Sequence, residues 1–358
     1  LTGFVLMDLL STTELSMLLC VVGSVVAWTL WIDTAPRPRL IAVGVLGMLA
    51  FAIGFSANPL YARIYERLLF RETHEIFVNK IETKAGVIGV LGDGVIFGGG
   101  VYDGRMSVDF VDDQNGIFRA YSISAFHPDP KRVLMIGLSG GAWAQVIGNH
   151  PQLEELVVVE INRGYIDLVP RYPVVASLLN NARIKIVIDD GRRWIRNHKG
   201  EKFDVVVMNT AIHWRSFASN VLSREFLELV GTVLNPGGIV MFNATGSSEV
   251  HRTAALAYAD ALRFATMMVG SNTPIEIDPE RWEVVMSHYT IDGAPVVNAD
   301  GAGRDALDRN VARLRAVDAA GLGQGEWDSS ERRDFVLRRT EGLRIVTDDN
   351  MGLEWRKH

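Results

Sequence analysis

Two stretches near the start of the chain contain no charged residue, and they constrain the fold more than any other feature. Residues 15–32 and 40–57 are each 18 residues long and consist mainly of aliphatic, aromatic and small side chains. That length without charge is typical of a helix that crosses a bilayer. A polar link with Pro36 and Pro38 joins the two stretches. We therefore expect a transmembrane helical hairpin within residues 1–60; a buried hairpin in a soluble protein is the alternative.

The basic residues predict how this hairpin is oriented. The link between the two stretches carries Arg37 and Arg39. The part that follows carries more basic residues, namely Arg63, Arg67, Arg71, Lys80 and Lys84. Because cytoplasmic flanks are enriched in Lys and Arg, we expect a plasma (inner) membrane protein whose C-terminal part is cytoplasmic. Residues 61–73 are predicted to form a connecting amphipathic helix, either lying on membrane lipid or serving as an ordinary connector.

Composition excludes several classes of protein. The 36 basic and 42 acidic residues give a net charge of −6, and no basic run stands out, so a nucleic-acid partner is not expected. The single cysteine, Cys20, excludes an internal disulfide framework and a paired-cysteine metal site, and no metal is expected. The length of 358 residues suggests roughly two domains at about 150 residues each.

A β-rich segment is predicted over residues 74–128. Short apolar runs at 75–81, 86–91 and 94–99 alternate with glycine, which is typical of strands joined by turns. The sequence Gly92-Asp93-Gly94 is a hairpin signal. We expect a small antiparallel β domain that precedes the main domain.

The main domain, predicted over residues 129–295, begins with a strand at 132–136 that leads into the loop Gly137–Gly141. A helix and a second strand follow, and the second strand ends in Glu160, 23 positions after Gly137. A glycine loop with an acid about 20 residues later is typical of a nucleotide-binding βαβ unit. We therefore expect Glu160 to accept hydrogen bonds from the ribose hydroxyls.

The alternation of strands and helices continues beyond this unit. Further strands are predicted at 183–188, 203–208 and 239–243, and the runs 264–269 and 284–289 are interpreted as a closing antiparallel pair. This pattern predicts an α/β fold of the class I methyltransferase-like, Rossmann type. Residues 296–358 are predicted to form a C-terminal extension with a helical patch at 305–321.

Several motifs together resemble the spermidine synthase family, over roughly residues 74–270. They are the loop Gly137–Gly141, Val159–Asn162, Asp190-Gly191 and Phe203–Val206. The late Thr347–Asn350 looks like the ending of membrane-fused homologues. The resemblance implies a co-substrate, either S-adenosylmethionine or its decarboxylated form, with the acid of Asp190 on the adenine amino group. It implies these donor-binding residues: Gly137, Ser139, Gly140, Glu160, Ile161, Asn162, Asp190 and Gly191.

The sequence departs from this family where the reaction takes place. Asn209 stands where the family has an aspartate, and an amide cannot act as a general base. The acid of the family's donor loop is replaced by Ser139 or Gly140, which favours S-adenosylmethionine itself as donor. We therefore consider His213 as the candidate base. Two further acids, Asp93 and Asp103, are candidates for the acceptor site.

Three classes of function follow from these residues. The first is a membrane-anchored transferase that moves an aminopropyl or related group from an adenosyl sulfonium donor to an amine. The second is an S-adenosylmethionine-dependent methyltransferase or an S-adenosylmethionine-cleaving enzyme, and the third is a non-catalytic nucleoside sensor. The expected partners are a small-molecule amine or lipid-like acceptor and membrane lipid. Either a monomer or a homo-oligomer is compatible with the sequence.

Overall fold

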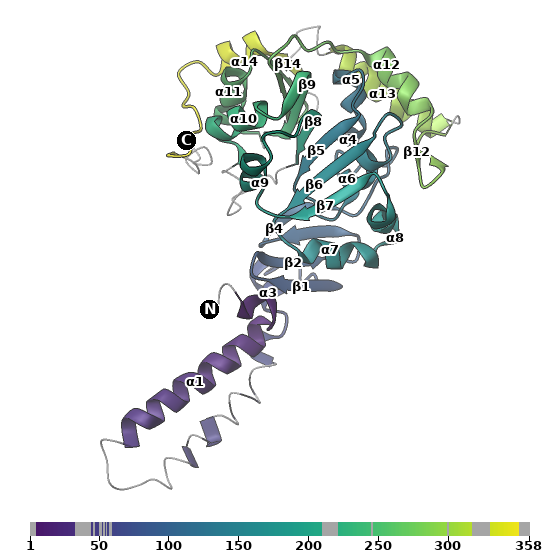
Figure 1. Cartoon of the computed structure of the whole chain (residues 1–358). Helices are drawn as coiled ribbons and strands as arrows, with labels where there is room; N and C mark the ends of the chain where they lie inside the picture. The colour runs from purple at the N-terminus through teal and green to yellow at the C-terminus, as the bar shows by residue number, and fades with distance from the viewer. Residues whose placement is uncertain are drawn as a thin grey trace. The chain divides into compact units, whose positions relative to one another are not determined.

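The chain divides into two compact units, Leu1–Asp93 and Gly94–His358 (Figure 1). The structure, a computed structural model, describes residues 5–32, 44–45, 47–49, 52, 54, 56, 59–209, 221–244, 246–298, 301–316 and 330–350, with the side chains of 31 and 32 excluded.

The first unit contains a long apolar helix, α1 (Thr12–Ile32), preceded by the short η1 (Leu6–Asp8). A capping box starts α1: Ser11 N–H donates to the Glu14 carboxylate at 2.7 Å, and Glu14 N–H donates to Ser11 Oγ at 3.3 Å. Residues Thr12–Leu30 have a mean hydropathy of 1.7, and none is buried. The first predicted span is thus a helix long and apolar enough to cross a membrane. The second, at 40–57, lies mostly outside the described residues.

A β-hairpin within the same unit holds the start of α1. Strands β1 (Asn79–Thr83) and β2 (Gly86–Val90) pair antiparallel, and α3 (Ile64–Leu69) lies within the connecting helix expected at 61–73. The Glu82 carboxylate accepts hydrogen bonds from Thr12 N–H at 2.6 Å and from Thr12 Oγ1 at 2.7 Å. A carboxylate at a helix N-terminus pairs with otherwise unsatisfied N–H groups, so the hairpin stabilises this end of α1.

The second unit is built on a mixed sheet, and among its described residues that sheet has eight strands in the order β14-β10-β11-β9-β8-β5-β6-β7. The strands are β5 (Arg132–Ile136), β6 (Glu155–Glu160), β7 (Ile184–Ile188), β8 (Phe203–Met208), β9 (Leu234–Asn243), β10 (Asp260–Phe264), β11 (Met267–Ser271) and β14 (Ser330–Arg332). Strands β9, β8, β5, β6 and β7 are parallel, whereas β11, β10 and β14 are joined antiparallel. A separate antiparallel hairpin, β3 (Val95–Gly98) and β4 (Val101–Arg105), precedes them. The predicted α/β fold with preceding antiparallel strands is confirmed.

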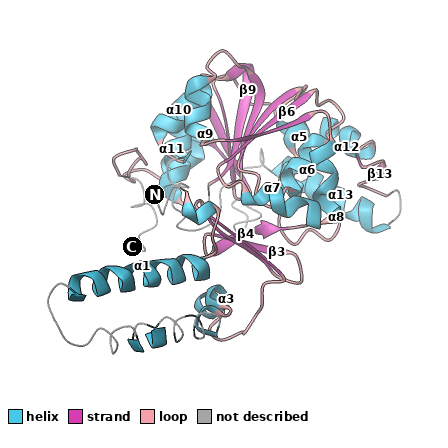
Figure 2. Ribbon diagram, turned by 60° about the horizontal axis from the view of Figure 1, so that its bottom comes forward, coloured by secondary structure: helices cyan, strands magenta, loops and turns pink. Residues whose placement is uncertain are grey.

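Helices cover both faces of this sheet (Figure 2). One layer contains α9 (Gly191–Asn197), α10 (Arg224–Gly231), α11 (Ser248–Ala257) and α14 (Arg333–Arg339). The other contains α4 (Phe118–Tyr121), α5 (Ile123–Phe126), α6 (Ala142–Gly148), α12 (Pro279–Ser287) and α13 (Gly301–Ala316). Because both faces are covered, the central strands are continuously apolar: Val157–Val159 and Val205–Val207 are at most 4% exposed.

Short helical turns link β6 to β7, and a small hairpin follows α12. The turns are α7 (Gly164–Leu168), η2 (Val169–Arg171), α8 (Pro173–Ala176) and η3 (Ser177–Asn180). The hairpin consists of β12 (Thr290–Ile291) and β13 (Ala294–Pro295).

The predicted closing pair of strands at 264–269 and 284–289 is wrong. The first run contains the end of β10, a turn at 265–266 and the start of β11, and these two strands pair with each other. In the second run, residues 284–287 belong to helix α12. Asp278 caps this helix by accepting from Arg281 N–H at 2.7 Å, and Pro279 occupies its first turn. Trp282 and Met286, four positions apart, are fully buried. The apolar run therefore follows the helical period rather than the period of a strand.

Candidate functional site

The predicted site residues lie near the point in the sheet where the strand order reverses. Strand β5 pairs with β6 on one side and with β8 on the other. The chain runs outward from β5 through β6 to β7, and then returns to β8. In such sheets ligands bind outside the carboxyl ends of the strands at this reversal. The glycine loop follows β5 and Asn209 follows β8, so both lie at that edge.

The loop after β5 requires residues that tolerate unusual backbone angles. Gly137, Ser139 and Gly141 have φ values of +90°, +49° and +86°, a region in which glycine is favoured. No atom lies within 4 Å of the place where a Cβ would stand on Gly137, which leaves open space beside the backbone there. At Gly141, a Cβ would come within 2.7 Å of Leu178 Cδ2, so close packing also requires glycine.

Glu160 connects this loop to the end of β6. Its side chain is buried, and its two carboxylate oxygens accept backbone hydrogen bonds from Leu138 N–H and Asn162 N–H, each at 2.6 Å. The two bonds fix the carboxylate between the glycine loop and the turn that follows β6.

Two exposed apolar side chains lie beside Glu160. Ile161 is 41% exposed and follows β6, whereas Ile188, opposite Glu160 in the β6–β7 register, is 43% exposed. Asn162 is buried and its side-chain oxygen accepts from Gly164 N–H at 3.0 Å, which shapes the turn into α7. Exposed isoleucines next to a fixed carboxylate suit a ligand with a flat apolar ring and a polar sugar.

Asp190 and Gly191 begin helix α9. Asp190 is half-buried and caps the helix, since its carboxylate accepts from Arg193 N–H at 2.8 Å. A Cβ on Gly191 would come within 2.7 Å of Ile136 Cγ2, so glycine lets α9 approach the end of β5. Asp190 is therefore held at the same sheet edge as the glycine loop.

A side chain at Gly140 would have to displace two neighbouring side chains. A Cβ at this position would stand 2.1 Å from Ile96 Cδ1 and 2.8 Å from Met106 Sδ. Both of these side chains are buried, at 1% and 8% exposure. The packing of β3 and of the segment after β4 against the loop thus explains why glycine occupies this position.

Asp103 of β4 lies against the same loop. Ser139 Oγ donates to the backbone oxygen of Asp103 at 2.7 Å, and the carboxylate of Asp103 accepts a short hydrogen bond from Tyr165 Oη of α7. Both side chains are buried, at 8% and 4% exposure. The sequence predicted Asp103 as a candidate acid of the acceptor site. It did not predict Tyr165, since no local pattern marks a tyrosine in α7 as the partner of Asp103.

The other predicted catalytic residues are Asn209, His213 and Asp93. Asn209 is half-buried and directly follows β8, whereas His213 lies outside the described residues. Asp93 is exposed and belongs to the first unit. In the part of the chain that the structure describes, no three His, Cys, Asp or Glu side chains are grouped as metal ligands would be.

Comparison with known proteins shows which family this part of the chain resembles. The spermine/spermidine synthase domain family matches residues 122–275. A spermidine synthase of Dictyostelium discoideum is 32% identical over 115 residues, which are 32% of this chain and 40% of that protein. A polyamine aminopropyltransferase of Pyrobaculum arsenaticum is 26% identical over 161 residues, 44% of this chain and 53% of that protein. A putrescine N-methyltransferase of Nicotiana attenuata is 29% identical over 118 residues, 33% of this chain and 32% of that protein.

A solved structure supports the fold independently. A crystal structure of spermidine synthase in complex with the transition state analogue AdoDATO matches with a TM-score of 0.52 and 17% identity, covering 67% of this chain and 85% of that one. The chain spans about a third to a half of the length of these curated relatives. The matched part includes the glycine loop, Glu160, Asp190 and Asn209. Residues 122–275 of this chain are therefore similar to the spermine/spermidine synthase domain family.

Proposed function

We propose that the second unit is a transferase that moves an aminopropyl group from an adenosyl sulfonium donor to a small amine. The observation that carries this proposal is the Glu160 carboxylate, buried and held by two backbone bonds beside an open glycine loop. The names of the relatives, spermidine synthase and polyamine aminopropyltransferase, support the same reaction class. The two units would then combine a membrane anchor with a transferase.

Each part of the donor has a counterpart in the site. Glu160 would accept hydrogen bonds from the ribose hydroxyls, and Ile161 and Ile188 would contact the adenine ring. Asp190 would accept from the adenine amino group with the part of its carboxylate not used for capping. The open space beside Gly137 would let the donor approach the backbone closely.

The reaction itself needs positioning more than acid or base catalysis. The amine nitrogen attacks the propyl carbon next to the sulfonium sulfur, the carbon–sulfur bond breaks, and its electron pair stays on sulfur. The new amine then gives up a proton. Holding the two reacting atoms in line, about 3–3.5 Å apart, provides most of the acceleration. Asn209 can accept a hydrogen bond from the amine but cannot take its proton, and His213 stays the predicted base.

Asp103 changes the expected choice of donor. The sequence suggested that the loop lacks an acid and so favours S-adenosylmethionine. The buried Asp103 carboxylate belongs to a residue whose backbone oxygen binds Ser139, and it would instead attract the ammonium of a donor without a carboxylate and repel a donor that carries one. We therefore propose that the decarboxylated donor is preferred.

A competition assay tests both the function and the donor. The purified protein is incubated with both donors and putrescine, and the nucleoside and amine products are identified. We expect methylthioadenosine together with spermidine, and we expect Asp103→Asn to lose most of the preference. Asp112→Asn, which changes an exposed acid after β4, is the matched control. Consumption of S-adenosylmethionine only, by both wild type and Asp103→Asn, would refute the donor proposal.

Methyl transfer is a second candidate function. Putrescine N-methyltransferases are among the relatives, and Asn209 departs from the catalytic aspartate that the resemblance implies. The same assay separates the two reactions, because methyl transfer leaves S-adenosylhomocysteine. Methylthioadenosine without a new amine would indicate cleavage, and nucleoside binding without any product would indicate a sensor.

We also propose that α1 anchors the protein in a membrane, with the second unit on the cytoplasmic side. The helix is unburied over its whole apolar length, and burying that surface in lipid removes it from water. The excess of arginine after the apolar segments supports the orientation.

A further inference from the structure

The segment near the C-terminus that carries Thr347, Asp348, Asp349 and Asn350 forms a closed turn. The Asn350 side chain accepts from Thr347 N–H at 2.8 Å and donates to the Ile345 backbone oxygen at 2.8 Å. The backbone N–H of Asn350 also donates to Thr347 O at 3.2 Å. These bonds fix the backbone on both sides of Asp348.

The carboxylate of Asp348 joins two elements that border the site. One oxygen accepts from Arg192 Nη2 and the other from Ser223 Oγ, each at 2.6 Å. Arg192 is the second residue of α9, directly after Asp190 and Gly191. Ser223 is the N-cap of α10, the first helix that the structure describes after Asn209. The Asp348 side chain therefore connects the start of α9, next to Asp190 and Gly191, with the start of α10, the helix that follows Asn209.

Backbone contacts hold the turn against the same helices. Arg224 N–H donates to Val346 O at 2.9 Å, and Asp348 N–H donates to the Glu225 carboxylate at 3.0 Å. Val346 N–H donates to Thr253 Oγ1 of α11 at 2.8 Å. Burial raises the pKa of Asp348, but the hydrogen bonds from Ser223 and Arg192 outweigh it and leave the pKa below its usual value. The carboxylate is therefore charged at neutral pH.

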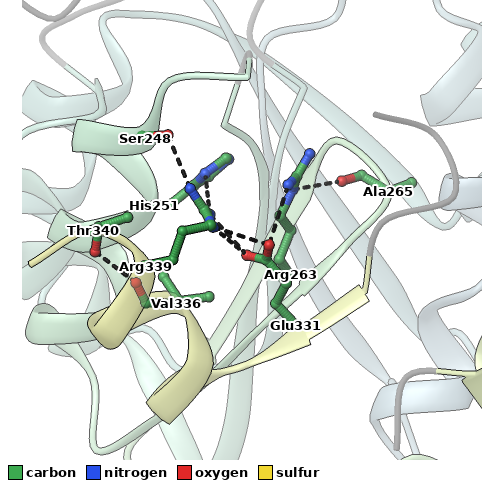
Figure 3. Close-up of polar contacts among 8 residues, drawn as sticks. All are labelled: Ser248, His251, Arg263, Ala265, Glu331, Val336, Arg339 and Thr340. Atoms are coloured by element: carbon green, nitrogen blue, oxygen red, sulfur yellow. Dashed lines mark hydrogen bonds and ion pairs between the residues drawn. The ribbon is translucent and has the colours of Figure 1, made fainter. Parts of the chain in front are cut away.

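The start of the same C-terminal stretch is fixed by an ion pair between a buried carboxylate and a partly buried guanidinium (Figure 3). The Arg339 guanidinium contacts both oxygens of Glu331, with Nη2 at 2.7 Å and Nε at 3.0 Å, and Glu331 is 3% exposed. Arg339 Nη1 also donates to Ser248 Oγ of α11 at 3.0 Å, and its Nη2 lies 3.2 Å from His251 Nδ1. With β14 and α14 held in this way, the turn around Asp348 has a defined position on the domain.

We propose that Asp348 is a positioning residue, which sets the start of α9, with Asp190 and Gly191, relative to the start of α10. This inference rests on the proposed function, since it assigns Asp348 to the same donor site. Arg192 is only 16% exposed at its side chain, so loss of the charge would leave a largely buried guanidinium without its carboxylate. The turn that carries Asp190 would then be free to shift.

The test is Asp348→Asn, which keeps the size of the side chain and an acceptor for Ser223 but removes the charge that pairs with Arg192. We expect kcat/KM for the donor to fall about ten- to a hundredfold, because small displacements of a binding residue reduce turnover strongly. Most of the loss should appear in KM and in the calorimetric affinity for methylthioadenosine, with circular dichroism unchanged. Asp349→Asn, the same change one residue further along, is the matched control.

A double-variant cycle shows whether the effect passes through Arg192. Asp348→Asn combined with Arg192→Gln should lose no more affinity than either change alone, because both remove the same ion pair. If Asp348→Asn does not fold, Arg192→Gln tests the pair from the other side. Unchanged KM and affinity in a folded Asp348→Asn protein would overturn the inference, as would additive losses in the double variant. If Glu160→Gln weakens methylthioadenosine binding and Asp348→Asn does not, only this inference fails; if neither does, the proposed function fails as well.

Discussion

The replacement of Glu160 by glutamine tests the donor site most directly. This change keeps the shape of the side chain but replaces one carboxylate oxygen by an amino group and removes the charge. In the structure both oxygens accept a backbone N–H at 2.6 Å, one from Leu138 and one from Asn162. Glutamine has a single acceptor oxygen, so one of the two N–H groups would face a second donor in a site where the side chain is 4% exposed.

The size of the effect follows from these two bonds. A hydrogen bond to a charged group contributes about 1.5–3 kcal/mol, and a buried donor left unsatisfied costs about 1–3 kcal/mol. Glu160→Gln should therefore cost about 2–5 kcal/mol, divided between folding stability and ligand binding. If the ribose hydroxyls also use this carboxylate, the affinity for methylthioadenosine should fall at least about tenfold, equivalent to about 1.4 kcal/mol.

Calorimetric titration with methylthioadenosine measures the binding part, and thermal unfolding without ligand measures the stability part. Glu155→Gln is the matched control, because Glu155 lies at the other end of the same strand. Its carboxylate pairs with Arg132 Nη2 at 2.8 Å, but its side chain is 38% exposed, so that pair should contribute no more than about 1 kcal/mol. An affinity of Glu160→Gln equal to that of the wild type would refute the assignment of Glu160 to the donor.

Three further predictions concern packing, pH and the membrane. Gly140→Ala should lower the free energy of unfolding by about 1–3 kcal/mol, because Ile96 and Met106 must move, whereas Gly200→Ala, with no neighbour within 4 Å, should not; thermal unfolding of both variants checks this. Burial lowers the pKa of His150 to about 4, so the unfolded chain takes up a proton at a higher pH than the folded one. The free energy of unfolding should therefore decrease as the pH falls from about 6.5 towards 4, by about 2 kcal/mol at pH 5. Urea unfolding at pH 7 and pH 5 should show this loss in the wild type, and His150→Gln should lack it. The protein should resist extraction from membranes by high salt and require detergent, while release by salt alone would reject a span by α1.

The sequence alone determined those features that depend on short segments. The glycine loop and Glu160 belong to one βαβ unit, whose strand, loop, helix and strand follow one another directly, so their spacing predicts their meeting at one sheet edge. The absence of charge over residues 15–32 similarly predicts the apolar helix α1, because length and hydropathy are local properties. Local pattern failed at 284–289, because a short apolar run fits a strand and one face of a helix equally well.

Only the tertiary structure decided which distant side chains meet at the site. The absence of an acid at Gly140 is visible in the sequence, but its physical reason, the contact with Ile96 and Met106, is not. Asp103 meets Ser139 across 36 positions, and Asp348 meets Arg192 across 156 positions. No local periodicity encodes such pairs, because they depend on how a hairpin and a C-terminal turn pack onto the domain. The candidate donor-binding residues could therefore be proposed from motifs, whereas the long-range contacts of Ser139 and Arg192 required the packed fold.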